Sequence, residues 1–214
     1  MISKNGARIE VADQVVLDGR LALFHQQQRW LAVADLHFGF ELSQRAAGNL
    51  FPLWGMQTIQ NRISDLLRDY SPRQLILLGD LIHDRAAAVA FSNWIGELRE
   101  RADVILISGN HDRHLDKGLN ILPLWRSDGF CFHHGHCDVE SVGGDVRVIG
   151  HHHPAQVVRD GAGLRLKLPA FVQDDRCWIM PAFSPWAAGT IWPQEGQTRL
   201  WLCSPTRIIS MAGV

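Results

Sequence analysis

Cysteine is scarce in this sequence, and neither sign of charge is in excess. The four cysteines among 214 residues form no Cys-x-x-Cys pair, which argues against a disulfide framework and favours reduced thiols in a cytoplasmic protein. Lysine and arginine together number 21 against 22 acidic residues, giving a net charge of −1 at pH 7. The chain therefore has no global basic field that would attract nucleic acid or an anionic membrane.

Long apolar runs are also missing. One long uncharged stretch, residues 177–194, is interrupted by three prolines, which excludes a membrane-spanning helix there. The first residues lack the apolar core of a signal peptide, and no low-complexity tract or fixed-period repeat occurs. We expect a soluble, cytoplasmic globular protein with a large core.

The first half alternates between short apolar runs and amphipathic segments. The runs WLAVA (30–34), QLILLGD (74–80) and DVILIS (103–108) have the pattern of strands buried on both faces. Residues 55–70 carry apolar side chains at helical spacing, and a second such segment surrounds Trp94. Strand, helix, strand, helix and strand with short connections predict a parallel sheet.

The second half differs, because the helical period disappears after about residue 129. Short strand-like runs follow one another and are punctuated by glycine and proline turns. A hairpin joined through Asp-Gly is predicted nearer the start, at 15–24. We therefore predict an α/β fold with a parallel βαβ first half and a β-rich second half. No linker separates the halves, so residues 1–214 are interpreted as a single domain.

Polar side chains collect where the predicted strands end. Five strand patterns run directly into residues that bind metals, and ten of the eleven histidines lie in or near these ends. The five segments are 35–37 (DLH), 79–80 (GD), 109–112 (GNHD), 134–136 (HGH) and 150–153 (GHHH). Because ligands gather at the carboxyl ends of parallel strands, we expect these side chains to meet.

Each segment alone has an ordinary explanation. A lone DxH is common, and GD after an apolar strand is more often a turn than a ligand. His151 and His153 are two residues apart, so both imidazoles lie on one side of an extended segment. The occurrence of all five segments, in order at successive strand ends, favours one shared metal site over five unrelated loops.

On these residues the chain resembles the calcineurin-like metallophosphoesterases, whose ordered signature is DxH, GD, GNHD, an HG-type histidine and GHxH. The resemblance runs over the whole chain, and its motifs are highly specific. It implies a four-layer α/β/β/α sandwich. It also implies an enzyme that hydrolyses phosphoesters with two divalent metal ions.

The resemblance implies a role for each matched residue. Asp35, His37 and His153 would hold the first metal, Asn110, His134 and His151 the second, and Asp80 would bridge the two. Manganese is the expected metal, with iron and zinc as alternatives. A metal-bridging hydroxide would attack phosphorus in line. His111 is the expected proton donor to the leaving group, and Asp112 either orients His111 or caps the next element.

A narrower resemblance rests on ADLHFGFELSQRAAGNLFP, GHHHPA, LKLPAF and IMPAFSPWAAG. These segments are similar to bacterial metallophosphoesterases associated with DNA ligase and the DNA-damage response, and to archaeal relatives. The similarity implies a Mn²⁺-dependent phosphodiesterase or endonuclease that acts on DNA in repair, with DNA ligase and helicase as partners.

The metal signature leaves the substrate open. The alternative enzyme is a phosphatase, phosphodiesterase or pyrophosphatase for a small nucleotide or a lipid-linked substrate. A metal-stabilised scaffold without catalysis is the remaining class, weakened because His111 and all seven ligand positions are present. The oligomeric state stays open.

Several further side chains lie close to the motifs. Arg45, Arg85 and Arg113 are candidates for holding non-scissile phosphates, although each is individually more typical of a solvated surface. His136 is a candidate substrate contact. No role is assigned to His83, His114, His133 or His152, and the last is expected to point away from the site. Among eight tryptophans, four in loop-like contexts are candidates for base stacking: Trp54, Trp125, Trp186 and Trp192.

Overall fold

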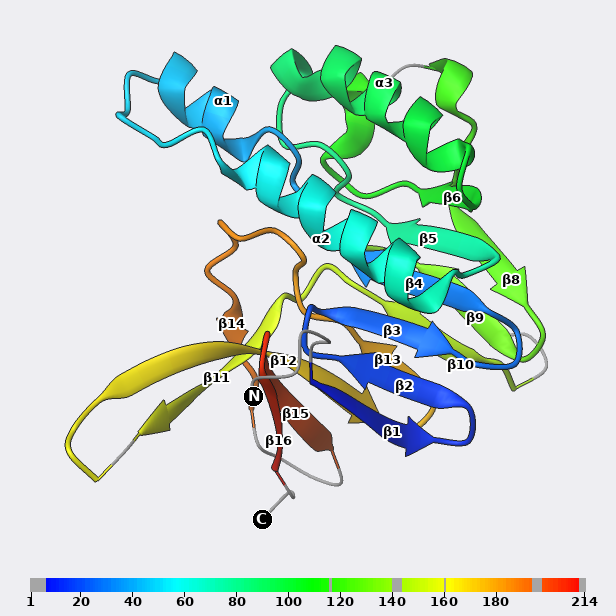
Figure 1. The fold of residues 1–214 in the computed structure, drawn as a ribbon, viewed down its shortest axis with the longest axis vertical. Helices are drawn as coiled ribbons and strands as arrows, with labels where there is room; N and C mark the ends of the chain where they lie inside the picture. Colours follow the sequence, from blue (N-terminus) through cyan, green and yellow to red (C-terminus); the bar gives the residue numbers. More distant parts are fainter. Residues whose placement is uncertain (1–6, 116, 140–143, 160, 194–197, 212–214) are drawn as a thin grey trace.

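Two β-sheets and three α-helices make up the computed structural model of this chain (Figure 1). It describes residues 7–115, 117–139, 144–159, 161–193 and 198–211, with the side chains of His114 and Lys117 also left outside the description. No helix in this described part is long and apolar enough to cross a membrane.

The first sheet has seven strands in the order β1 to β7. They are β1 (Arg8–Ala12), β2 (Val15–Asp18), β3 (Ala22–His25), β4 (Trp30–Ala34), β5 (Gln74–Leu78), β6 (Asp103–Ile107) and β7 (Ile121–Leu122). Strands β1 to β4 pair antiparallel, which confirms the predicted hairpin at β2 and β3. Strands β4 to β7 pair parallel, with Ala34 beside Leu78 and Leu78 beside Ile107. The carboxyl ends of β4, β5 and β6 therefore lie level at one edge.

The helices follow the apolar spacing of the sequence. They are α1 (Phe40–Ala46), α2 (Gly55–Tyr70) and α3 (Ala88–Arg99). The bounds of α2 match the predicted segment, and its buried side chains include Ile59, Ile63, Leu66 and Leu67. In α3 the buried side chains are Phe91, Trp94, Ile95 and Leu98, as the spacing predicts. Helix α1 was not predicted, because its short sequence has no clear amphipathic pattern.

The second sheet has nine strands and is built after residue 123. They are β8 (Leu124–Ser127), β9 (Phe130–His133), β10 (Val146–Ile149), β11 (Pro154–Arg159), β12 (Arg165–Asp174), β13 (Cys177–Ile179), β14 (Thr190–Ile191), β15 (Arg199–Ser204) and β16 (Arg207–Met211). Seven run in the order β14-β11-β12-β13-β10-β9-β8, and β15 pairs with β12 and β16. Strands β9 and β10 are parallel, so their carboxyl ends also share one edge.

The predicted α/β fold of two packed sheets is confirmed, and one detail differs. All three α-helices precede β6, and the only helical structure in the described residues beyond β6 is short 3-10 turns. The helical layer that a four-layer α/β/β/α sandwich places over the second sheet is therefore not formed by the described residues of the second half. The physical reason is the loss of helical spacing after residue 129.

Aromatic side chains join the two sheets. The ring of Trp30 in β4 lies 5.0 Å from both Phe130 and Phe132 in β9, edge to face. Trp178 and Trp201 belong to the same buried cluster. At the edge where the parallel strands end, the Phe183 backbone N–H donates to the Ala34 carbonyl. This contact brings the ends of the two sheets together.

Candidate metal centre

The polar segments that follow the parallel strands meet where the two sheets join. Asp35 follows β4, Asp80 follows β5 and Asn110 follows β6, all at one edge of the first sheet. His134 follows β9 and His151 follows β10 in the second sheet. Local sequence places each side chain at a strand end, and the packing of the sheets brings them into one cluster.

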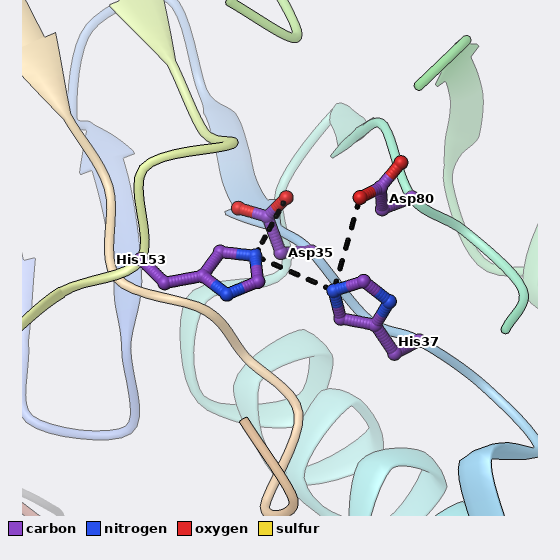
Figure 2. Close-up of side chains that lie close together, drawn as sticks. All are labelled: Asp35, His37, Asp80 and His153. Atoms are coloured by element: carbon purple, nitrogen blue, oxygen red, sulfur yellow. Dashed lines mark hydrogen bonds and ion pairs between the residues drawn. The ribbon is translucent and has the colours of Figure 1, made fainter. Parts of the chain in front are cut away.

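Four side chains of the predicted metal-binding segments converge on one point (Figure 2). Asp35, His37, Asp80 and His153 each offer a ligand atom, and these atoms all lie within 4.8 Å of one another. Nε2 of His153 lies 3.3 Å from Oδ1 of Asp35 and 3.3 Å from Nε2 of His37. Nε2 of His37 lies 3.8 Å from Oδ2 of Asp80. Two imidazoles and two carboxylates are donors that divalent transition metals accept.

A second group of donors lies beside Asp80, and Nδ1 of His134 in this group also lies 3.6 Å from Oδ1 of Asp35. Nε2 of His134 is 3.1 Å from Oδ1 of Asn110 and 3.4 Å from Oδ1 of Asp80. The ring of His151 lies 5.0 Å from the ring of His134. The two oxygens of Asp80 therefore face different groups, with Oδ2 toward His37 and Oδ1 toward His134.

Burial sets the electrostatics of the centre. Asp35 is fully buried, and burial raises the pKa of its carboxyl to about 6, although His153 opposes the shift and the charge of Asp80 adds to it. Burial also lowers the pKa of the His37 and His134 imidazoles. Neutral imidazole is the form that binds a metal. Two buried carboxylates close together call for positive charge beside them, so the residues present fit divalent cations.

The backbone is strained at five of the seven predicted ligands. The φ angles are 55° at Asp35, 43° at His37, 44° at Asp80, 67° at His151 and 46° at His153. Non-glycine residues rarely adopt this left-handed region, at a cost of order 1–3 kcal/mol each. Hydrogen bonds hold the conformation, because the His37 N–H donates to the Asp80 carbonyl at 2.8 Å and the His151 N–H donates to Asp35 Oδ2 at 2.9 Å.

Two motif glycines permit this close packing. A Cβ atom at Gly79 would clash with the imidazole of His134, and the φ of Gly79 is +69°. A Cβ atom at Gly109 would clash with the backbone N and the carboxylate of Asp80. The glycines of the GD and GNHD segments are thus required because another motif's donor lies against them.

His111 and Asp112 have different surroundings. The His111 side chain is 49% exposed, its Nε2 lies 4.0 Å from Asp80 Oδ2, and its backbone N–H donates to Asp80 Oδ1. Asp112 is buried and accepts N–H bonds from Gly109 at 2.6 Å, Leu81 at 2.7 Å and Ile82 at 3.2 Å. Both oxygens of Asp112 accept from backbone N–H groups that precede it in the chain, so the geometry shows neither an orienting contact with the His111 ring nor a side-chain cap on the 3-10 turn that follows.

The remaining histidines divide by position. His83 lies against the centre, with ring centroids 5.7 Å from His37 and 6.2 Å from His111. His136 is exposed, and its ring is 5.2 Å from His134. His152 is exposed and contacts the rings of His151 and Trp192. His133 is buried in β9, and the side chain of His114 lies outside the described residues.

The three candidate arginines are not brought into the cluster. Arg45, Arg85 and Arg113 are all exposed. Within the described part of the chain, none of their guanidinium groups makes a hydrogen bond or an ion pair with the donors. They stay candidates for contacts with a bound substrate only.

Sequence reasoning missed a buried acid, Glu41, although it named two of the aromatic side chains near it, Trp54 and Trp186, as candidates for base stacking. Glu41 in α1 accepts the Met56 N–H at 2.7 Å and the Trp186 indole N–H at 3.2 Å. Trp186 packs against Trp54 and Phe51 with ring centroids 4.1 and 4.5 Å apart, and Phe40 lies 4.7 Å from His83. We call Phe40, Phe51, Trp54 and Trp186 the aromatic platform. No local signal reveals Glu41, since its partners are distant in sequence.

Comparison with known proteins gives one family and two solved structures. A family model described as calcineurin-like phosphoesterase matches residues 29–177. The chain is similar to the crystal structure of Pseudomonas putida nuclease MPE, at 29% identity and a TM-score of 0.75 over 97% of this chain and 100% of that chain. It is also similar to Yfce, a phosphoesterase from E. coli, at 18% identity and a TM-score of 0.47 over 86% of this chain and 99% of that chain. A search of curated proteins finds no significant match.

Proposed function

Because the chain belongs to the calcineurin-like phosphoesterase family, we propose that this metal-dependent phosphoesterase hydrolyses phosphodiester bonds in DNA. Two features support the finer assignment. The similar Pseudomonas putida protein is described as a nuclease and is covered over its whole length. The aromatic platform lies against His83 at the edge of the metal-ligand cluster, where it can receive a nucleobase.

The metal centre is proposed to hold two divalent ions. Asp35, His37 and His153 would bind one, Asn110, His134 and His151 the other, with Asp80 between them. When bound, such ions lower the pKa of a water molecule and neutralise charge on phosphate oxygens. We propose manganese as the metal, because carboxylate and amide oxygens suit it, and iron and zinc, which imidazole suits, are tested beside it.

The protein's own groups then bind and orient the phosphoester. His111 is half exposed and lies 4.0 Å from Asp80, so its imidazole can reach a leaving-group oxygen of a phosphoester held beside Asp80. We propose that His111 donates the proton to that oxygen. Asp112 acts as a positioning residue, because it ties the Gly109 loop to Leu81 and Ile82 next to Asp80.

The repair context is part of the same proposal. DNA ligase and helicase are the partners implied by the narrower sequence resemblance, and a cytoplasmic location accords with the four free thiols. Nonspecific affinity for DNA depends on clustered cations that contact its phosphates. Because the net charge of this chain is only −1, we propose that it also contacts the bases of DNA.

The observation that carries the proposal is the placement of Asp80, whose two oxygens face two groups of donors. The test uses Mn²⁺-loaded protein with bis-p-nitrophenyl phosphate, p-nitrophenyl phosphate, single-stranded DNA, nicked DNA and nucleotide diphosphates side by side. Cleavage of the diester and of DNA is expected, and Asp80→Asn should abolish both. Preference for the monoester or the nucleotides would assign a small-molecule substrate, and inactivity with metal bound would overturn the enzyme assignment.

A further inference from the structure

A cavity of about 400 Å³ lies outside the metal-ligand cluster. Its walls come from the β2–β3 turn, from α2, from β12 and from residues 182–189. Three cations line it, Arg20, Arg62 and Lys167, and none of its described lining residues carries a carboxylate. A cavity with this charge selects against cations and favours an anion.

Arg62 is one of two cavity cations that have no described acidic partner. Its guanidinium donates to the Phe183 carbonyl at 2.9 Å and lies 4.9 Å from the Phe183 ring centre. Burial lowers the pKa of Arg62, and no carboxylate of the described residues pairs with it. Arg20 contrasts with it, because two carboxylates bind Arg20, Asp18 at 2.7 Å and Asp69 at 2.7 Å. A partly buried cation without a counter-charge loses hydration that no carboxylate replaces.

Lys167 supplies the second cation that lacks a described acidic partner. Its Nζ donates to the Gly189 carbonyl at 2.7 Å. A guanidinium has five N–H donors and an ammonium has three. The described contacts of Arg62 and Lys167 use one donor each, so both side chains retain donors for the oxygens of a ligand.

We propose that this cavity is a second phosphate-binding site, separate from the metal centre, which takes the phosphate group of a nucleotide or of a nucleic-acid backbone. The guanidinium group of Arg62 and the ammonium group of Lys167 can donate hydrogen bonds to the anionic oxygens of a phosphate monoester or diester. The volume lies in the range of small-molecule pockets, roughly 300–1,000 Å³. The inference rests on the cavity and its cations and does not need the enzyme to act on DNA.

The same loop connects this site to the metal centre. The Ser184 N–H donates to the Asp35 carbonyl at 3.2 Å, and the Thr190 N–H donates to the His153 carbonyl at 2.7 Å. Arg62 and Lys167 bind the Phe183 and Gly189 carbonyls of that loop. A phosphate held by both cations would therefore steady the segment that positions Asp35 and His153.

Equilibrium dialysis of inorganic phosphate against the metal-loaded protein tests the proposal. The wild type should bind two phosphate equivalents, one at the metal centre and one in the cavity. Asp80→Asn should lose the first only, and Arg62→Gln should weaken the second on the order of tenfold to a hundredfold. The matched control is Arg68→Gln, on the same helix but exposed and paired with Asp65, which should keep both. If Arg62→Gln bound two phosphate equivalents with wild-type affinity, the proposal would be overturned.

Two further arms identify the source of the phosphate and guard against a folding defect. If the cavity holds a backbone phosphate, Arg62→Gln should raise KM for an oligonucleotide by a larger factor than it changes KM for bis-p-nitrophenyl phosphate. If it holds a free nucleotide, thymidine monophosphate should change wild-type turnover of the small diester beyond the competition at the metal centre, and Arg62→Gln should show that competition alone. Lys167→Gln, at an exposed residue, should show the same loss of phosphate if Arg62→Gln fails to fold. Retention of both equivalents by a folded Lys167→Gln variant would then overturn the proposal.

Discussion

The Nε2 atoms of His37 and His153 lie 3.3 Å apart, and each also faces a buried carboxylate, Asp80 for His37 and Asp35 for His153. Burial lowers the pKa of His37, so this imidazole is neutral near pH 7 and presents a lone pair. Donor atoms that converge in this way are stabilised when they share a cation. The folded state should therefore bind divalent metal and gain stability from it.

Addition of Mn²⁺ to chelated protein is expected to raise the unfolding temperature. A ligand at one hundred times its Kd stabilises a folded protein by about 2.7 kcal/mol, which corresponds to roughly 5–10 °C for a chain of this length. Thermal unfolding followed by circular dichroism measures the shift. His37→Ala and His153→Ala should lose most of it, and an unchanged midpoint in the folded wild type would contradict the metal centre.

His111→Asn should separate catalysis from metal binding. The His111 side chain is half exposed and lies at the rim of the cluster, so its replacement should leave metal content unchanged. Turnover should fall by about 10²- to 10⁴-fold for diesters with poor leaving groups, because they need a proton most. Activated nitrophenyl esters should be affected least. The measurement is kcat across a leaving-group series together with elemental analysis, and loss of metal from the variant would show that the role is wrong.

Asp112→Asn, unlike His111→Asn, should lower the stability and the metal affinity of the protein. Its carboxylate accepts three backbone N–H groups, and an amide NH₂ facing one of them leaves a buried donor unsatisfied. The expected loss of stability is about 1–3 kcal/mol, measured by urea unfolding of the metal-loaded protein. Metal affinity should fall too, since the loops bearing Asp80 and Asn110 lose their connection. A leaving-group dependence like that of His111→Asn would instead return Asp112 to the catalytic set.

Sequence patterns located the strands and the donor segments for a physical reason. A strand buried on both faces must be apolar throughout, so WLAVA and QLILL stand out, and the polar residues that follow them mark the strand ends. The fold then brings these ends together. Helix α2 was predictable in the same way, because one apolar face packs on the sheet.

Contacts between distant segments could not be read from local patterns. Glu41 joins α1 to Trp186, and β12 pairs with β15 as well as with β13, yet neither residue types nor spacing specify these partners. Arg62 lies among the polar residues of α2, where the sequence is typical of a solvated face. Its place in a cavity follows only from the position of residues 182–189.

Acid should destabilise the protein through Asp18. Burial opposes ionisation of this carboxyl, but hydrogen bonds and charge from Arg20 outweigh it and hold its pKa below the usual 3.8. A depressed folded pKa contributes stability above the unfolded value, and this contribution is lost as pH falls through the folded value. Urea unfolding of chelated protein should show a stability gap between wild type and Asp18→Asn that is full at pH 7 and shrinks below pH about 4. Asp65→Asn, at an exposed pair, should show little gap at either pH. A gap that did not shrink at all between pH 4 and pH 2 would contradict this account.

Trp54 is the most exposed residue of the aromatic platform, with 46% of its surface exposed. Its ring packs against the ring of Trp186, with 4.1 Å between the ring centroids. Glu41 fixes the Trp186 indole, so the exposed Trp54 face is held in place for a base to stack on it. Stacking is worth about 1–3 kcal/mol per base, which predicts that Trp54→Ala lowers kcat/KM for single-stranded DNA by roughly 5- to 150-fold.

The decisive comparison for Trp54 uses an oligonucleotide with an abasic tract. This substrate has the same phosphates and no bases, so Trp54→Ala should cleave it as fast as the wild type does. Trp54→Phe should restore part of the activity on normal DNA, because a smaller ring still stacks. Val89→Ala on α3, another exposed apolar residue, is the matched control and should change neither rate. An equal loss on both substrates would mean that Trp54 supports the metal centre through Trp186 and Phe40, and the platform would then be a packing feature and not a base contact.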